Sequence, residues 1–286
     1  MSRFALLNIR PSFEGYQQLI NLYEKNKGYH LGTLELSIHK WFSANLSSAL
    51  GGILDKLKEE LITVKFSQMP SKTEEIMMKN GFLYYYSYPK LKDYYHTTIP
   101  YLKLKPTDSR TFFNYIDKDL LNREELPDLS KAAKEKMVDS IYEVFSNAQI
   151  HSDTKNIYTC GQVFPRKHVI EFTITDTGMG FKERIRRSFG KRIRATDAIR
   201  WAFEDKNTTK QKISGGLGLA MLREFVILNK GKIQVVSDNG FYNFDSKGET
   251  VKEFYGSFPG TVVNVQFRTD DPNSYSLKRE TDNDLY

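Results

Sequence analysis

The sequence predicts an α/β protein of two parts, in which sheets pack on helices. Strand-like and helix-like hydrophobic patterns alternate over residues 1–88, and a second series of helices and strands follows over residues 107–270. The composition is 40% hydrophobic and 27% charged over 286 residues, which leaves enough chain for two hydrophobic cores. We therefore expect a small α/β domain, followed by an α+β sandwich in which a mixed sheet packs on helices.

The first part alternates strand and helix three times. Strands carry apolar residues at every second position, whereas helices carry them three or four positions apart. On this basis we expect strands at 6–9, 34–38 and 61–66, with helices between the first two strands, at 43–60, and at 73–80 before Gly81. Such alternation favours a small α/β layer.

Residues 89–106 are expected to connect the two parts. They overlap an aromatic stretch, Tyr84–Tyr101, whose tyrosines either pack a connecting hairpin, which we favour, or stack on nucleotide bases. After it we expect helices at 109–121, 129–151 and 217–228, strands at 157–163, 168–175, 232–236 and 261–267, and a polar lid at about 181–213. The polar end from Thr269 to Tyr286 is expected to fray, with residues 271–286 as a tail.

The composition disfavours several classes of protein. No run approaches eighteen apolar residues, so we expect no membrane span, and the first residues lack the apolar stretch of a signal peptide. Cys160 is the only cysteine, so we expect no internal disulfide and no cysteine metal cluster. A cytoplasmic protein is the simplest interpretation.

The net charge of +7 comes partly from a basic run, Lys182–Arg200, inside the expected lid. The run is interpreted as a solvated helical face, or as a surface that contacts nucleotide phosphates or an acidic partner. Nucleic acid is an alternative partner but is not favoured, because the sequence has no zinc-ligand spacing and no RNA-binding aromatic motif.

Three short segments of the second part carry residues suited to binding a nucleotide. The first contains Glu143 and Asn147, which are four residues apart and so share one face of a helix. An amide oxygen suits Mg²⁺, and a neighbouring carboxylate can accept a proton from an attacking water or hydroxyl. An exposed glutamate beside a hydrogen-bonded asparagine is the ordinary alternative.

The second segment, Asp176-Thr-Gly178-Met-Gly180, directly follows an expected strand. Gly178 and Gly180 allow a sharp turn and a close approach of the backbone. A carboxylate at a strand end can accept a hydrogen bond from the exocyclic amine of a base, although this pattern alone is often only a turn.

The third segment, Ser214-Gly215-Gly216-Leu217-Gly218, is glycine-rich and leads into an expected helix, so its backbone N–H groups can meet phosphate oxygens. Thr208, Thr209 and Lys210 lie just upstream, where two hydroxyls and an ammonium group can reach a terminal phosphate. The segment is neither a Walker P-loop nor a Rossmann fingerprint, because the glycine spacing of each is absent.

Together, the three segments resemble the motifs of the Bergerat-fold (GHKL) ATPases, the superfamily of gyrase, the ninety-kilodalton heat-shock chaperones, histidine kinases and MutL. Gly260-Thr261 resembles a later Gly-Thr element of the same superfamily. The resemblance covers about residues 107–270 and implies ATP and Mg²⁺ as cofactors. It further implies that Asp176 reads the adenine amine, Asn147 chelates Mg²⁺, Thr261 helps to hold adenine, and Lys210 with the 215–218 loop holds phosphates.

Glu143 stands where gyrase-type ATPases and anti-sigma-factor serine kinases keep a general base, whereas most histidine kinases have asparagine there. The stretch from Glu143 to His151 and the Thr208-Thr209-Lys210 element especially resemble the serine kinases. None of the five histidines is followed by an acidic residue, and no helical dimerisation hairpin precedes the ATPase region, so the sequence departs from histidine kinases.

Phe42-Ser-Ala-Asn-Leu46 lies between an expected strand and helix, and Met78-Lys-Asn-Gly81-Phe ends the third expected helix. This order over residues 1–88 resembles STAS domains, the anti-anti-sigma partners of such kinases. Phosphorylated STAS domains carry Asp-Ser-Ser-Gly at the junction where this chain has Ser43-Ala44-Asn45-Leu46. The phosphoacceptor is therefore missing unless Ser43, Ser47 or Ser48 replaces it. We interpret this segment as a docking or regulatory module for a protein partner. The lid is a second surface suited to a partner, and a homodimer is a further alternative.

Three functions remain open at this point. The first is an ATP-hydrolysing switch, in which Glu143 activates water. The second is a protein serine/threonine kinase, in which Glu143 deprotonates a partner hydroxyl. The third is a non-catalytic ATP sensor. The first two share every site residue. The altered junction favours hydrolysis or a substrate in trans, and the presence of Glu143 disfavours the sensor.

Overall fold

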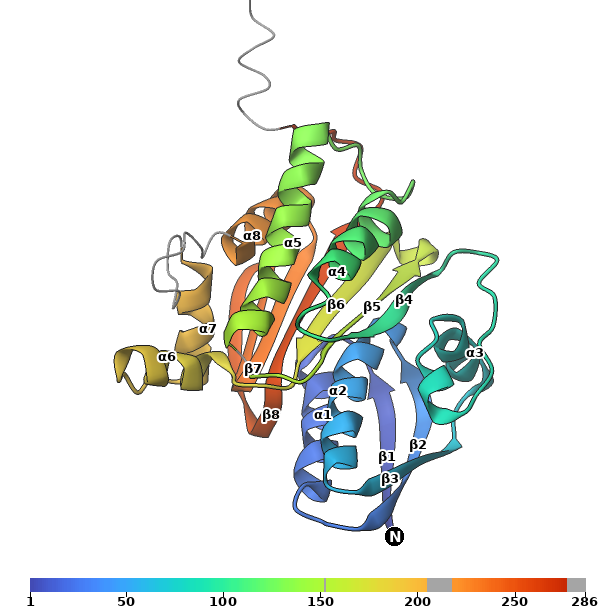
Figure 1. The fold of residues 1–286 in the computed structure, drawn as a ribbon. Helices are drawn as coiled ribbons and strands as arrows, with labels where there is room; N and C mark the ends of the chain where they lie inside the picture. The colour runs from blue at the N-terminus through green and yellow to red at the C-terminus, as the bar shows by residue number, and fades with distance from the viewer. Residues whose placement is uncertain (152, 205–217, 277–286) are drawn as a thin grey trace, which may run out of the picture.

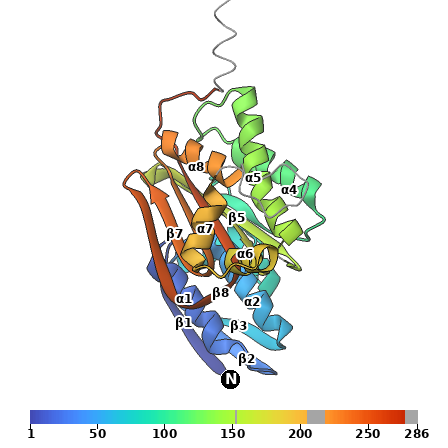
Figure 2. The same ribbon diagram turned by 90° about the vertical axis from the view of Figure 1, so that its left-hand side faces the viewer.

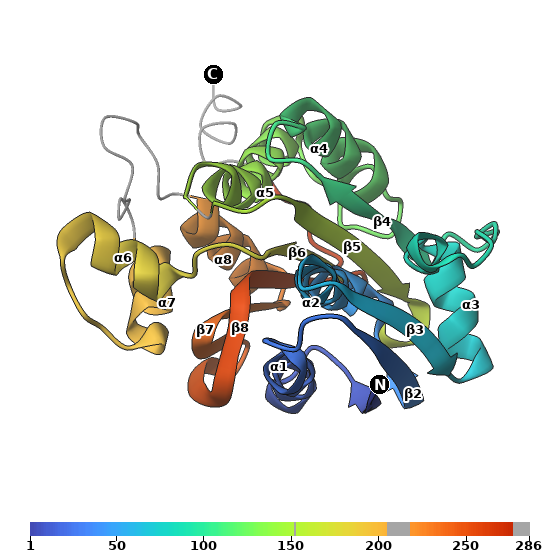
Figure 3. The same cartoon turned by 60° about the horizontal axis from the view of Figure 1, so that its bottom comes forward.

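The computed structural model describes residues 1–151, 153–204 and 218–276, and it shows a mixed α/β protein with two sheets (Figure 1). The structure has four layers: a three-stranded sheet, a pair of helices, a five-stranded sheet, and a second group of helices (Figure 3). Within these residues, no helix has the length and apolar character that crossing a membrane requires.

The first sheet is parallel, with strand order β1-β2-β3. Its strands are β1 (Ser2–Ile9), β2 (Gly32–Phe42) and β3 (Ile62–Gln68), and they are connected by α1 (Phe13–Asn26) and α2 (Ser47–Glu59). A third helix, α3 (Ser71–Lys79), follows β3. The alternation predicted for residues 1–88 is confirmed. Each connecting helix buries an apolar face, such as Tyr16, Leu19 and Ile20 in α1.

The second sheet is antiparallel throughout, with strand order β4-β5-β6-β8-β7. Its strands are β4 (Thr98–Leu104), β5 (Ile157–Phe164), β6 (Val169–Asp176), β7 (Lys232–Asp245) and β8 (Gly248–Arg268). The expectation of a mixed sheet is therefore wrong. The physical reason is that β5–β6 and β7–β8 are joined by short hairpin connections, and β8 rather than β7 lies beside β6.

Helices cover the face of the second sheet that points away from the first. They are α4 (Ser109–Tyr115), continued by a π-helical turn at Ile116–Leu121, α5 (Lys131–His151) and α8 (Gly218–Leu228). Figure 2 shows α5 and α8 side by side on this face. Two shorter helices, α6 (Phe181–Phe189) and α7 (Ala195–Phe203), lie at the β7 side of the sheet. They lie within residues 181–203 of the segment that was expected to be a polar lid at about 181–213.

The expected connecting segment contains a strand of the second sheet. Residues 98–104 form the edge strand β4, which pairs with β5. Its register shifts between Ile99 and Leu102, and this irregularity at an edge accommodates Pro100, which has no N–H to donate. Tyr101 is 6% exposed and packs edge-on against Phe82, with 5.1 Å between ring centroids. The aromatic stretch is thus partly core, and not simply a connecting hairpin.

One of the two hydrophobic cores joins the parts that the sequence suggested were separate. It lies between the two sheets and takes residues from α1, α2 and the first sheet, together with Tyr158, Cys160 and Val262 from the second sheet. The other core lies between the second sheet and α4, α5 and α8. Residues 1–88 therefore form an integral layer against the second sheet. Whether this layer is STAS-like remains a prediction.

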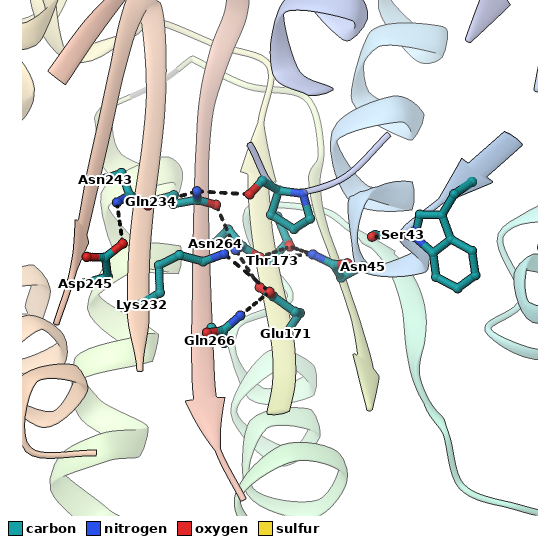
Figure 4. A network of polar contacts seen from close by, with 12 residues as sticks. Ser43, Asn45, Glu171, Thr173, Lys232, Gln234, Asn243, Asp245, Asn264 and Gln266 are labelled. Carbon is teal, nitrogen blue, oxygen red and sulfur yellow. Dashed lines mark hydrogen bonds and ion pairs between the residues drawn. The ribbon is translucent and has the colours of Figure 1, made fainter. Parts of the chain in front are cut away.

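A buried polar network fixes the position of this layer (Figure 4). Asn45, which precedes α2, donates hydrogen bonds of 3.0 Å from Nδ2 to Thr173 Oγ1 and to Asn264 Oδ1. Asn264 in turn donates to Glu171 Oε2 at 2.8 Å, and Lys232 Nζ lies 3.6 Å from the same carboxylate. Because buried polar groups are costly without partners, these contacts favour one seating of α2 on the sheet over others.

The end of the chain is more ordered than expected. Tyr275 accepts a backbone hydrogen bond of 2.8 Å from Ser130 and packs against Phe225, with 5.1 Å between ring centroids. Residues 269–276 are therefore held against α5 and α8 and do not fray. Residues 277–286 lie outside the described part of the chain.

Cys160 provides a test of the layer interface. It is fully buried between the sheets, where its thiol donates to the Ala44 carbonyl oxygen at 3.2 Å and burial raises its pKa well above the usual range. We expect the native protein to show no reaction with an aromatic disulfide reagent, and the protein unfolded in guanidinium to show one thiol per chain. Rapid stoichiometric reaction of the native protein would mean that the layer opens readily.

Candidate functional site

Three of the residues predicted for a nucleotide site converge on one cavity. Asn147 comes from α5, Asp176 from the end of β6 and Thr261 from β8. The remaining lining residues are Val144, Ala148, Ile174, Phe181, Arg184, Leu219 and Val263. The lining is mostly apolar with a few polar groups, which is typical of ligand sites. The side chains leave about 20 Å³ between them, which is room for a single water molecule.

Asp176 is held at the floor of this cavity by β6 and β8. It is 5% exposed, it lies opposite Thr261 in the strand register, and its Oδ1 accepts a hydrogen bond of 3.0 Å from the Gly178 amide. Gly260 has φ +140°, and a Cβ there would overlap the Asp176 carbonyl oxygen. The Gly260-Thr261 pair is therefore explained by geometry, because only glycine lets β8 pass this close to the Asp176 backbone.

The segment after Asp176 is tied to β7. The backbone N–H of Phe181 donates to Ser237 Oγ at 2.9 Å, and that of Lys182 donates to Asp238 Oδ2 at 3.1 Å, so β7 caps the start of α6. Gly180 is the N-cap of α6, and a Cβ there would overlap the Asp238 carboxylate. Ser237 Oγ also lies 3.2 Å from Thr261 Oγ1, which links this cap to the cavity.

Glu143 and Asn147 lie one turn apart on α5, as the spacing predicted. Asn147 lines the cavity, together with Val144 and Ala148 on the same helix. Glu143 is partly exposed and lies outside this lining. The structure thus brings Asn147 together with Asp176. Glu143 lies one turn before Asn147 on α5.

Most of the predicted phosphate-binding residues lie outside the described part of the chain: Thr208, Thr209, Lys210, Ser214, Gly215, Gly216 and Leu217. Gly218, the last residue of that motif, is the first residue of α8, and the next residue, Leu219, lines the cavity. The first turn of α8 therefore borders the cavity. Backbone N–H groups at the start of a helix are suited to meeting anions.

Arg184 is a member of the cavity that the sequence analysis did not identify. Its side chain is on α6, is 7% exposed, and donates from Nη2 to the Asn147 carbonyl oxygen at 3.4 Å. Its guanidinium carbon lies 5.2 Å from the centroid of the Phe181 ring. Burial lowers the pKa of Arg184 to about 10, while the nearby Asp176 and Asp238 carboxylates act in the opposite direction.

A signal in the sequence points to Arg184. Phe181, Arg184 and Ile185 share one buried face of α6 at helical spacing, so this arginine stands on an apolar face. It was grouped instead with the other cations of the basic run. Four of those cations are paired on the surface: Arg186 and Arg187 with Glu183 at 2.6 and 3.0 Å, Arg194 with Asp197 at 2.9 Å, and Arg200 with Glu249 at 2.6 Å. Their pairing agrees with a solvated helical face.

The serines considered as phosphoacceptors are buried on the opposite face of the second sheet. Ser43 is 3% exposed and accepts a hydrogen bond from the Trp41 indole at 3.1 Å. Ser47 and Ser48 have no exposed surface, and Ser48 Oγ lies 3.3 Å from Thr175 Oγ1. These hydroxyls are therefore shielded from the cavity and from a second protein in this arrangement.

Two larger hollows contain none of the predicted residues. One, of about 640 Å³, lies between α7, α8 and the β7–β8 hairpin, where Arg200, Arg223 and Tyr242 line it. The other, a groove of about 560 Å³, is lined by Trp41 and Phe164, among others. Size alone would favour them, but the buried carboxylate and the amide at the smaller cavity are the groups that nucleotide chemistry requires.

The donor groups at the cavity fit magnesium only in part. In the described ranges, no group of three or more His, Cys, Asp or Glu residues is placed to hold a metal ion. Mg²⁺ keeps several waters and is commonly bound by one or two protein oxygens together with substrate phosphates. The amide oxygen of Asn147 is such a ligand, so the residues fit Mg²⁺ that arrives with a nucleotide.

Comparisons with known proteins do not add an assignment. No model of a protein family matches the chain, and no curated protein sequence matches it. The functional argument therefore rests on the motifs and on the geometry of the cavity.

Proposed function

We propose that this chain is a Mg²⁺-dependent ATP-binding protein of the Bergerat (GHKL) type that hydrolyses ATP as a regulatory switch. The observation that carries the proposal is the convergence of Asn147, Asp176 and Thr261 on one cavity beside the first turn of α8. These residues are separated by up to 114 positions, and their chemistry matches a base amine, a metal ion and a purine ring edge.

Each element would have a distinct part in binding. Asp176 accepts a hydrogen bond from the adenine amine, and Thr261 lies across from it on β8. Asn147 holds Mg²⁺, which would neutralise phosphate charge when bound. The start of α8 and the 208–218 segment hold the phosphates. The apolar residues Val144, Ala148 and Val263 enclose the base.

Glu143 is the proposed general base. It stands one turn from Asn147 on the same face of α5, so it would accept a proton from a water that attacks a phosphate held with Mg²⁺ at Asn147. Its partial exposure leaves it accessible to water. A protein kinase of the anti-sigma type would use the same residue, but the burial of Ser43, Ser47 and Ser48 disfavours phosphorylation of the chain by itself.

The protein partner is proposed to bind the N-terminal layer or the surface of α6 and α7. The N-terminal layer packs on the second sheet, and α6 contributes Phe181 and Arg184 to the lining of the cavity. In this scheme α6 transmits the state of the site, since its first turn is capped by Ser237 and Asp238 next to Thr261. A homodimer remains an alternative to a separate partner.

The test is incubation of the purified protein with γ-labelled ATP and Mg²⁺, while free phosphate and protein-bound label are followed together. Release of free phosphate is the expected result. Transfer of label to a co-purified protein would instead support the kinase, and ATP binding without either product would support the sensor. Absence of ATP binding at millimolar concentration would contradict all three.

A further inference from the structure

Arg184 is a buried cation whose hydrogen-bonding capacity is incompletely used. It is 7% exposed, and its Nε–H has no hydrogen-bond partner in the described structure. Its contact with the Asn147 carbonyl oxygen is 3.4 Å, at the long end of the range for such bonds. A buried donor without an acceptor costs free energy, so an arginine in this position calls for an explanation.

The surroundings of Arg184 point to a ligand as the missing acceptor. The side chain lines the same cavity as Asp176, Asn147 and Thr261, and the cavity has no other buried cation among its described residues. The guanidinium carbon lies 5.2 Å from the centroid of the Phe181 ring, a contact that helps to hold this charge at the cavity. The cavity thus offers a carboxylate acceptor and a guanidinium donor next to each other.

We propose that Arg184 is a base-recognising residue of this site, which donates a hydrogen bond to a purine ring nitrogen adjacent to the amine held by Asp176. This inference rests on the proposed ATP-binding function and adds a specificity residue to it. Adenine presents the required pattern, since N1 and N7 are acceptors on either side of the exocyclic amine. On entry of the base, the ring nitrogen supplies an acceptor for the Nε–H, which has none in the described structure.

Entry of a purine requires more space than the cavity has in this structure. About 20 Å³ is too little for a purine, so side chains must move when the base enters. The hydrogen bond from β7 fixes the start of α6. Arg184 lies about one turn farther into this helix, and its guanidinium is at the end of a long side chain. Rotation of this side chain makes room while it keeps the charge at the cavity.

A chemical double-mutant cycle tests the proposal. ATP, 1-deaza-ATP and 7-deaza-ATP are titrated by calorimetry into the wild-type protein and into Arg184→Met, which keeps the length of the side chain but removes every donor. We expect Arg184→Met to bind ATP about tenfold more weakly, and one of the deaza analogues to bind the wild type weaker by a similar factor. That analogue and ATP should bind Arg184→Met equally well.

A matched control is Arg187→Met, which alters an exposed arginine of the same helix that pairs with Glu183. It should bind ATP as the wild type does. Tighter binding of ATP by Arg184→Met would overturn the proposal, because the arginine would then be an obstacle. If Arg184→Met does not fold, the wild type alone decides, since equal affinity for ATP and both deaza analogues excludes the contact. Failure of the wild type to bind ATP at all would instead refute the proposed function.

Discussion

Replacement of Asp176 by asparagine is expected to weaken ATP binding by about 10- to 100-fold, because a hydrogen bond to a buried charged group is worth about 1.5–3 kcal/mol and the new NH₂ faces the base amine. Asparagine retains an oxygen for the Gly178 amide, which donates to Oδ1 in the native chain. The turn at 176–180 should therefore survive. Calorimetric titration of ATP in the presence of Mg²⁺ measures the effect.

The matched control is Asp197→Asn on α7, where the carboxylate pairs with Arg194 at the surface. This variant should bind ATP with unchanged affinity. The melting temperatures of both variants show whether the fold is intact. Wild-type affinity in a folded Asp176→Asn protein would mean that the carboxylate does not read the base.

Replacement of Glu143 by glutamine is expected to lower the rate of ATP hydrolysis by about 10²–10⁴-fold, the usual contribution of a general base. ATP affinity should change little, because Glu143 lies outside the lining of the cavity. Binding and turnover are therefore separable in this variant, whereas Asp176→Asn loses both. Phosphate release under single-turnover conditions is the measurement.

Glu135→Gln is the control for this variant, since Glu135 is an exposed carboxylate about two turns before Glu143 on α5. It should hydrolyse ATP at the wild-type rate. Full turnover in Glu143→Gln would show that another group takes the proton, and the assignment of Glu143 as the general base would then be wrong.

The sequence is sufficient for most of the elements in the first 88 residues, because hydrophobic periodicity there agrees with the environment of each strand and helix. It is insufficient for the β7–β8 hairpin, which was expected only at 232–236 and 261–267. In the structure β7 continues to Asp245 and β8 already begins at Gly248, so both strands run through a stretch rich in Asp, Asn and Gly. Pairing along a hairpin with register shifts near Asp238 overrides those local preferences.

The seating of the N-terminal layer was also not predictable from local patterns. Asn45 and Thr173 form a hydrogen bond although they are 128 positions apart in the sequence, and no local pattern around either residue predicts this contact. Separate domains were the natural expectation from the change in pattern near residue 89. The shared core depends on the matching surfaces of α1, α2 and the second sheet, which a one-dimensional pattern does not contain.

Part of the candidate site was predictable from short sequence motifs. The Glu143–Asn147 spacing predicted two residues on one helix face, and the resemblance to the Bergerat-fold motifs pointed to Asp176 and Gly260-Thr261. The structure places these residues at or near one cavity. Arg184 was missed because a cation inside a basic run is usually solvated. Its burial depends on the turn at Gly180 and on the caps from Ser237 and Asp238, which aim that face of α6 inward.

The most direct test of the central claim is amide hydrogen exchange with and without saturating ATP and Mg²⁺, because it reports where the nucleotide binds. We predict slower exchange in residues 143–148, 174–184 and 260–263, with no change around Trp41 and Phe164 in the larger groove. Protection confined to that groove, or no protection in the three segments, would contradict a nucleotide site between α5, β6 and β8.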